Sequence, residues 1–225
     1  MSCPFLLFDF DGTLADSINM GLRIANNLAP EFGIEPLSEE QFAKARTMSI
    51  PKALKMFKIP LYKVPKAITM ALAEYRHVIH ELEPFTGIPE MLKELKDLGC
   101  HMALLTSNTG ENVNHFLDNH ELHYFDWIEG TSGILKKHGS IRKQIKKHKL
   151  DKKNVIYVGD EIRDIAAAKK SGIRVISVSW GFHGAELLSS KDPDYLVDNP
   201  QEIVELIKSL AIAKKAKFRK KKGLG

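Results

Sequence analysis

The chain is poor in cysteine and has no long apolar run, and these absences exclude several classes of protein. Its 225 residues include only Cys3 and Cys100, with no Cys-x-x-Cys pair and no secreted-type framework. No apolar segment approaches the length of a transmembrane helix, and the start of the chain lacks the basic region of a signal peptide. The nine histidines show no zinc spacing. We therefore expect two thiols, a reducing cytoplasmic location and no contact with membranes.

The positive charge of the chain is concentrated in its last fifteen residues. The formal net charge is +5, but residues 211–225 hold seven lysines and arginines and no acid. Without them, 26 basic residues face 28 acidic ones, so the body of the protein carries a net charge of −2. The segment 211–225 is typical of a disordered, solubilising terminus. Binding to nucleic acid or another anionic surface is the alternative that it leaves open.

Apolar strand-like runs alternate with helical patterns along most of the chain. The expected strands are Phe5–Phe8, Met102–Leu105, Trp127–Glu129, Val155–Val158, Val175–Val178 and a short edge strand at Tyr195–Val197. The expected helices are Pro89–Leu98, Glu111–His120, Ser140–Lys149, Asp164–Ser171 and Gln201–Leu210. This alternation predicts an α/β fold with a parallel sheet between two layers of helices, similar to a Rossmann core.

The interval from residue 16 to residue 85 breaks this rhythm because it has no clear strand run. Its helical patterns are Ser17–Ala29, Glu39–Arg46, Pro51–Phe57 and Lys63–Leu82. Pro84 and Gly87 punctuate the chain where the interval ends. We therefore expect an α/β core of residues 1–15 and 86–210 and an inserted helical domain of residues 16–85, with a hinge at each junction.

Polar residues follow three of the expected strands. Asp9 and Asp11 come directly after the first strand, and they share a face if the extended geometry continues. In open α/β sheets, ligands collect at the carboxyl ends of the strands. Two carboxylates at such an end suit Mg²⁺ binding, or a nucleophile beside a general acid/base. The structural alternative is a strand end with two solvated acids.

The order of the motifs resembles the haloacid dehalogenase superfamily of phosphohydrolases, and in particular its phosphoglycolate phosphatase-like members. That family carries Asp-x-Asp-Gly-Thr, a strand-terminal Thr or Ser, a lysine and Gly-Asp-x-x-x-Asp, and this chain has all four in that order between Phe5 and Phe182. The motif residues are Asp9, Phe10, Asp11, Gly12, Thr13, Thr106, Ser107, Asn108, Lys137, Gly159, Asp160, Glu161 and Asp164. The resemblance implies that the helical insert is a cap that excludes water and completes the substrate pocket.

The resemblance also implies a role for each central residue. Asp9 would attack phosphorus, and Asp11 would protonate the leaving alcohol and then take a proton from the hydrolytic water. The Thr106 hydroxyl and the Ser107 N–H would hold phosphoryl oxygens. Lys137 would offset the negative charge of Asp9 and the phosphate.

Mg²⁺ is the cofactor that the resemblance implies. The expected ligands are Asp9, Asp11 and Asp160, together with the Phe10 carbonyl. Asp164 would hold a metal-bound water or orient the lysine. Glu161 is a departure, since many relatives have Thr or Ser after Gly-Asp, and this leaves the details of metal coordination open.

Several of these residues have a structural alternative. Asp160 could be the N-cap of the following helix. Lys137 could be a solvated surface lysine, and the adjacent Lys136 could be the active-site lysine instead. Arg46, between two helices of the insert, could grip a carboxylate or second phosphate of the substrate, or could be an ordinary arginine at a helix end.

Together, the motifs predict a Mg²⁺-dependent phosphatase that hydrolyses a small phosphorylated metabolite through an aspartyl-phosphate. A phosphomutase of the β-phosphoglucomutase type has the same motifs and cap, and a phosphonatase using Lys52, Lys55 or Lys58 stays open. A non-catalytic binding protein on the same scaffold is the alternative from a different class, but a binding module has no need of both Asp9 and Asp11. The motifs decide neither the substrate nor the oligomeric state.

Overall fold

A six-stranded parallel sheet forms the centre of the computed structural model, which describes residues 3–130 and 137–221. The strands are β1 Phe5–Phe8, β2 Met102–Thr106, β3 Trp127–Gly130, β4 Val155–Gly159, β5 Arg174–Val178 and β6 Tyr195–Val197. They lie in the order β3-β2-β1-β4-β5-β6. Each predicted strand is present, and the predicted α/β fold class is confirmed.

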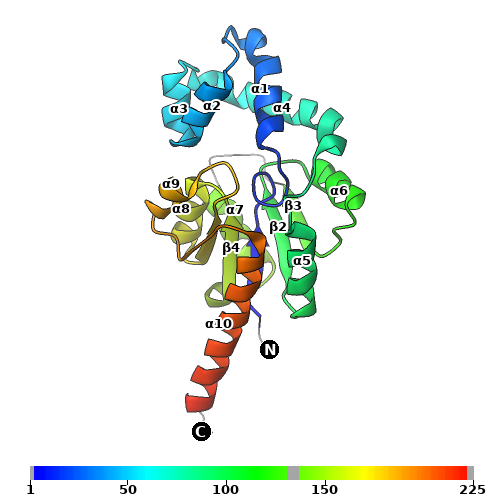
Figure 1. Ribbon diagram of the computed structural model, residues 1–225, viewed down its shortest axis with the longest axis vertical. Helices are drawn as coiled ribbons and strands as arrows, with labels where there is room; N and C mark the ends of the chain where they lie inside the picture. Colours follow the sequence, from blue (N-terminus) through cyan, green and yellow to red (C-terminus); the bar gives the residue numbers. More distant parts are fainter. Residues whose placement is uncertain (1–2, 131–136, 222–225) are drawn as a thin grey trace.

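Helices cover both faces of the sheet (Figure 1). One face carries α5 Ile88–Asp97, α6 Gly110–Asn119 and α10 Pro200–Lys221, and the other carries α7 Lys137–Lys147, α8 Ile162–Ser171 and α9 Ala185–Ser189. Side chains of β1 alternate between the two cores: Leu6 and Phe8 pack on the first face and Leu7 on the second. β1 is therefore apolar throughout, as expected of a parallel strand that is buried on both sides.

The strand order reverses direction at β1, which pairs with β2 on one side and β4 on the other. The chain runs outward through β2 and β3, and then returns to build β4, β5 and β6 on the opposite side. Such a reversal leaves a crevice at the carboxyl ends of the central strands, because the connections on its two sides lead away from each other.

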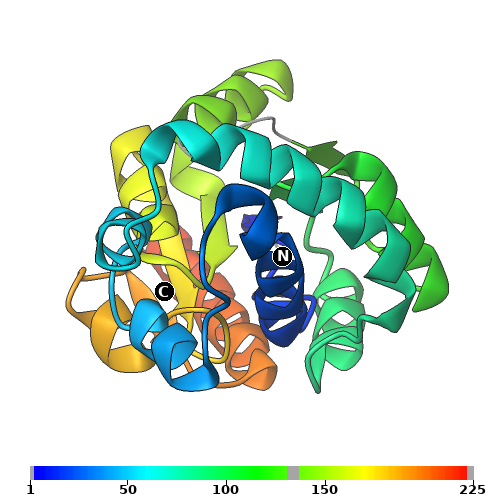
Figure 2. The ribbon, with the colours of Figure 1, turned by 90° about the horizontal axis from the view of Figure 1, so that it is seen from above.

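The helices of residues 18–81, here called the cap, lie above this edge of the sheet (Figures 1 and 2). They are α1 Ile18–Leu28, α2 Glu39–Arg46, α3 Ile50–Met56 and α4 Val64–Val78, with 3₁₀ turns at Ala29–Phe32, Leu61–Lys63 and Ile79–Glu81. The two connections to the sheet run side by side, and Ala15 and Pro84 form a β-bridge. The Asp16 N–H donates to the Glu83 carbonyl at 2.9 Å, which ties the two connections together.

The first part of the basic C-terminal segment is helical. Residues 211–221, for which the sequence predicts disorder, continue α10 to Lys221 (Figure 1). The alanines and lysines of this segment are strong helix formers, so the helix that starts at Pro200 has no local reason to end at residue 210. Within the described residues, no helix is long and apolar enough to cross a membrane.

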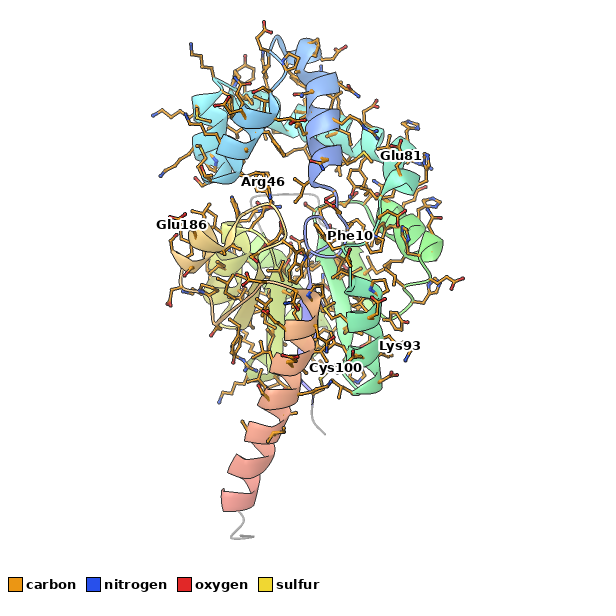
Figure 3. All side chains as sticks on the ribbon, viewed as in Figure 1. Phe10, Arg46, Glu81, Lys93, Cys100 and Glu186 are labelled. Atoms are coloured by element: carbon orange, nitrogen blue, oxygen red, sulfur yellow. A yellow bond between two sulfur atoms is a disulfide. The ribbon has the colours of Figure 1, made fainter. Side chains whose placement is uncertain are left out.

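The two cysteines form a disulfide, so the expectation of two thiols is wrong. Cys3 precedes β1 and Cys100 precedes β2, and the parallel pairing of these strands brings the two Cα atoms to 5.0 Å. Figure 3 shows Cys100 at the end of the sheet opposite the cap. A pair 97 residues apart carries no sequence signal for this contact. The cytoplasmic location stays a prediction, and the cysteines no longer support it.

We expect reduction of this disulfide to lower the stability of the fold, because the bond closes a long loop in the unfolded chain. The expected loss is about 2–4 kcal/mol, or roughly 5–15 °C in melting temperature. Thermal unfolding with and without reductant measures it. The double variant Cys3→Ser/Cys100→Ser is the control, and its melting temperature should not respond to reductant. Two free thiols in the unreduced, unfolded protein would contradict the assignment of the bond.

Candidate active site

The sheet brings the predicted motif residues together at the carboxyl ends of β1, β2 and β4. Asp9 continues β1 by one residue, since its N–H donates to the Val158 carbonyl at 2.8 Å. Its side chain is 3% exposed, and its Oδ1 accepts from the Phe10 N–H at 2.9 Å. Gly159 ends β4, and Asp160 follows it. The crevice at the strand reversal is thus lined by acids from both sides.

Lys137 lies in this crevice and contacts two of the acids. It is the first residue of α7 and is 7% exposed, and its ammonium donates to Asp9 Oδ2 and to Asp164 Oδ1. Burial lowers the pKa of Lys137, but the charges of Asp164 and Asp9 hold it well above its ordinary value. The lysine therefore stays charged. The alternative lysine, Lys136, lies outside the described residues.

Three buried carboxylates lie together here, and Lys137 bonds to two of them. Oxygens of Asp9, Asp160 and Asp164 lie within 4.8 Å of one another. Burial raises the pKa of Asp9 to about 6, with the Lys137 charge opposing the shift. Burial also raises the pKa of Asp160 well above its usual range, and the charges of Glu161 and Asp164 add to the effect. With all three ionised, the cluster keeps an excess of two negative charges beside Lys137.

A hard divalent cation fits this cluster. The donors are all carboxylate oxygens, which Mg²⁺ prefers, and a charge of +2 offsets the excess. The neighbouring Glu161 supplies a further observation, because its buried Oε2 has no hydrogen-bond partner within the described structure. Of the predicted ligands, Asp9 and Asp160 belong to the cluster and Asp11 does not. Asp164, expected in a supporting role, is its third member.

Asp160 is held in place by a tight shell of backbone and side chains. Its Oδ1 accepts from the Thr13 hydroxyl at 3.0 Å, and its Oδ2 accepts from the Phe182 N–H at 2.7 Å. A Cβ on Gly12 or Gly181 would lie 2.2 Å from an atom of this side chain. Gly12 also has a φ of +72°, a conformation that favours glycine. Both glycines are therefore needed for the acid to fit.

The N-cap residue of α8 is the neighbour of Asp160 and not Asp160 itself. Glu161 is the N-cap residue, and its N–H donates to Asp164 Oδ2 at 3.0 Å in a capping box. Asp164 thus bonds to the start of its own helix with one oxygen and to Lys137 with the other. Asp160 consequently does not take the capping role that the sequence left open. Glu161 also pairs with Arg163, with Oε1 and Nη2 2.5 Å apart.

Asp11 stands apart from the acid cluster and is held by neutral donors. Its Oδ1 accepts from the Tyr75 hydroxyl at 2.6 Å, and its Oδ2 accepts from Asn108 Nδ2 at 3.2 Å. Burial raises the pKa of Asp11, while the bonds from Tyr75, Asn108 and Ser17 oppose the rise. Sequence reasoning missed Tyr75. The pattern of residues 63–82 predicts a helix, but nothing in it distinguishes this tyrosine from an ordinary core residue.

The turn after β2 is rigidly built. Thr106 ends the strand with 1% exposure, and its hydroxyl accepts from the Asn108 N–H at 2.9 Å. The Asn108 side-chain oxygen accepts from the Thr109 N–H at 2.8 Å and from Asn112 Nδ2 at 2.9 Å. Ser107, the first residue of this turn, is part-exposed. These bonds fix the backbone at the place where the resemblance expects phosphoryl oxygens to bind.

Arg46 joins the cap to the core. A capping box of Ser38 and Gln41 starts α2, and Arg46 ends the helix facing the core (Figure 3). Its Nε donates to the Phe182 carbonyl and its Nη2 to the Gly181 carbonyl, each at 2.8 Å. The structure thus places the guanidinium on the backbone next to Asp160. The substrate contact, which the sequence left open beside the role of an ordinary helix-end arginine, stays a prediction.

His183 makes a second link between cap and core. It is fully buried, and its Nδ1 accepts from the Ile162 N–H at 3.1 Å. The proton therefore sits on Nε2, which donates to the Met48 carbonyl of the cap at 3.1 Å. Burial lowers the pKa of His183, so the neutral form that this arrangement requires is favoured. Sequence reasoning missed this histidine too, because no motif or spacing singles it out.

The chain belongs to the haloacid dehalogenase-like hydrolases, whose family model matches residues 6–178. A phosphoglycolate phosphatase of Synechococcus elongatus is 28% identical over 206 residues, which cover 91% of this chain and 97% of that protein. The crystal structure of a predicted phosphatase from Clostridium acetobutylicum superposes with a TM-score of 0.80 at 24% identity, covering 93% of this chain and 100% of that one. A candidate β-phosphoglucomutase of Thermotoga maritima has a TM-score of 0.64 at 20% identity, covering 92% and 99%. The predicted family is confirmed, and the likeness to the two structures concerns the fold.

Mg²⁺ should stabilise the protein more at pH 8 than at pH 5. The pKa of Asp9 rises from 3.8 to about 6 on folding, so the metal-free fold keeps a proton that the unfolded chain loses, and its stability falls as the pH rises through this window. Above pH 6 Asp9 is ionised and binds the cation more strongly, and Mg²⁺ at 100 times its Kd adds about 2.7 kcal/mol. Thermal unfolding measures the shift. Asp160→Asn should abolish it, and equal shifts at both pH values would contradict the assignment.

Loss of the Arg46 contacts should loosen the loop that holds Asp160. In Arg46→Ala, we expect the Phe182 and His183 amides to exchange with solvent roughly ten- to hundredfold faster, because two charge-assisted bonds to this loop are removed. Hydrogen exchange with mass spectrometry measures this. The matched control is Lys44→Ala, which removes an exposed cation from the same helix. Unchanged exchange in Arg46→Ala would show that the loop does not depend on the cap.

Proposed function

We propose that the protein is a Mg²⁺-dependent phosphatase that hydrolyses a small phosphorylated metabolite of the phosphoglycolate type. The observation that carries the proposal is the separation of the two motif carboxylates. Asp9 lies against the cation Lys137, whereas Asp11 lies two residues away among neutral donors. The lysine favours the charged form of Asp9 that attack requires, whereas the neutral donors leave Asp11 able to carry a proton.

In the first proposed step, a carboxylate oxygen of Asp9 attacks phosphorus as the bond to the leaving oxygen breaks. Asp11 gives its proton to that oxygen, so the product leaves as an alcohol and an aspartyl-phosphate remains. In the second step, Asp11 takes a proton from water. The water oxygen attacks phosphorus, the bond to Asp9 breaks, and inorganic phosphate and the free enzyme result.

The other residues of the site would control charge and position during these steps. Lys137 would hold the Asp9 carboxylate in one orientation and offset charge as phosphate arrives. Mg²⁺, held by Asp9 and Asp160 with Asp164 beside them, would supply further positive charge at the phosphoryl oxygens. The Thr106 hydroxyl and the turn after it would bind these oxygens on the opposite side.

A cavity under the cap supports an anionic substrate. It has a volume of about 530 Å³ and reaches from Ser49–Pro51 of the cap to Lys137 and to one side of α8. Among the described residues that line it, Lys137, Arg163, Lys170 and Lys191 are basic, and Glu161 is acidic. Its lining includes Lys137 but neither Asp9 nor Asp11, so the cavity lies beside the reacting groups and would hold the part of the substrate away from the phosphoryl group.

The names of the relatives support the choice of substrate. The Synechococcus elongatus protein matches over nearly the whole length of both chains and is named a phosphoglycolate phosphatase. The likeness to the candidate phosphomutase concerns the fold and does not favour that activity. The complete set of acids, with a lysine bonded to Asp9, likewise counts against a purely binding role.

Phosphate release from wild type and Asp9→Asn, with Mg²⁺ and with chelator, tests the proposal. We expect metal-dependent release from 4-nitrophenyl phosphate and from phosphoglycolate, and none from Asp9→Asn, because the amide is a poor nucleophile. The variant should keep the wild-type far-ultraviolet circular dichroism. Substantial Mg²⁺-dependent release by Asp9→Asn would contradict the nucleophile, and silence of the wild type on a panel of phosphorylated metabolites would contradict the phosphatase.

A further inference from the structure

Tyr75 makes a contact between the cap and the core that the general reaction scheme does not require. Its hydroxyl lies 2.6 Å from Asp11 Oδ1, although 64 residues separate the two in sequence. Tyr75 belongs to the cap helix α4, which crosses above the core (Figure 2), and its side chain is 7% exposed. A short bond between a phenol and a carboxylate is one of the stronger hydrogen bonds in proteins.

The chemistry of the two groups fixes the direction of this bond. A tyrosine hydroxyl is protonated at neutral pH and has one proton to give, and an ionised carboxylate can only accept. Tyr75 therefore donates and Asp11 Oδ1 accepts. When Asp11 itself gains a proton, the oxygen that already accepts a strong bond is the less favourable place for it. The proton then sits on Oδ2.

The surroundings of Oδ2 leave this oxygen open to exchange a proton. Its contact is the longer one, 3.2 Å from Asn108 Nδ2. The Asn108 side-chain oxygen is already occupied by the Thr109 N–H and by Asn112, so Asn108 is held in place and cannot turn its acceptor toward Asp11. The two oxygens of Asp11 are thus unequal: one is fixed by the cap, and the other is available to the substrate.

We infer that Tyr75 is a positioning residue, which selects Oδ2 of Asp11 as the proton-carrying oxygen and makes acid catalysis depend on the seating of α4. This inference rests on the proposed function. In the step concerned, the proton moves from Oδ2 to the leaving oxygen while the bond from that oxygen to phosphorus breaks. When α4 lifts from the core, Asp11 loses its strongest partner and can turn, so the acid is aligned only when the cap is seated.

Other contacts place α4 on the core at the same point. Asn112 of α6 donates to the Leu72 carbonyl, one turn before Tyr75, at 3.5 Å. Ser17, just before α1, is buried close to Asp11 and opposes the rise in its pKa. The acid/base group therefore sits where α4, α6 and the first connection to the cap converge, so a change in cap position reaches it directly.

A comparison of two leaving groups distinguishes a positioning role of Tyr75 from a merely structural one. An alkyl phosphate has a poor leaving group and needs a proton from the acid, whereas 4-nitrophenolate leaves without one. Because kcat/KM covers the steps up to the first irreversible one, it reports formation of the aspartyl-phosphate. We would measure it for Tyr75→Phe with 4-nitrophenyl phosphate and with phosphoglycolate, or with the alkyl phosphate of the panel that is hydrolysed fastest.

We expect Tyr75→Phe to lower kcat/KM for the alkyl phosphate by roughly 10- to 100-fold and for the aryl phosphate by less than about threefold. The control is Tyr62→Phe, which removes the hydroxyl of a cap tyrosine that is 79% exposed and should change neither value. In an Asp11→Asn background, Tyr75→Phe should not lower kcat/KM for the alkyl phosphate any further, because the carboxyl group that Tyr75 positions is gone.

Equal losses on the two substrates would overturn the inference and show that the hydroxyl only stabilises the cap. No loss on either would show that Asp11 is aligned without it. A further loss in the Asp11→Asn background would show that Tyr75 acts through another group. If the wild type releases no phosphate from any substrate, the proposed function fails and the inference fails with it, which is a different result from an active wild type with equal losses.

Discussion

The burial of three carboxylates around one lysine is the constraint on which the rest of the site depends. Asp9 follows β1, and Asp160 and Asp164 follow β4, and each acid needs fixed partners because unpaired buried charges are costly. Lys137 satisfies two of them, and the Phe182 N–H and the Thr13 hydroxyl satisfy the third. The reversal of strand order at β1 provides the place, since only there do loops from both halves of the sheet meet.

The same constraint explains why the cap and the core are joined through polar groups. Arg46 bonds to the carbonyls of Gly181 and Phe182, and the N–H of Phe182 bonds to Asp160. One short segment thus contacts the cap with one side of its backbone and a candidate metal ligand with the other. An apolar contact could hold the cap down equally well, but it would not orient a carboxylate. The cap is therefore part of the site's geometry as well as a cover over it.

Features that depend on local pattern could be predicted from the sequence, whereas features that depend on register and on the seating of the cap could not. The strands are recognisable from apolar runs, and Asp9 and Asp160 are expected together because the ends of parallel strands meet at one edge of the sheet. The place of Lys137 beside them is implied by the family resemblance alone. The contacts of Tyr75, His183 and the Cys3–Cys100 pair depend on how the cap seats and on which residues of β1 and β2 pair. The loop position of Arg46 directed attention to this residue, but it did not reveal that a backbone segment 135 residues away would occupy its guanidinium.

The separation of Asp9 from Asp11 shows how one turn can give two carboxylates different chemistry. Asp9 is buried and Asp11 is partly buried, and desolvation raises the pKa of each. Lys137 is a cation that opposes this shift at Asp9, so it favours the charged form of this carboxylate. The direct partners of Asp11 are a phenol, an amide and a hydroxyl, which stabilise its charge but do not prevent its protonation. A group that must gain and lose a proton in each cycle is better served by neutral donors than by a cation. Because two of these donors belong to the core turn and the cap helix, the fold sets this difference through the seating of the cap and not through the motif alone.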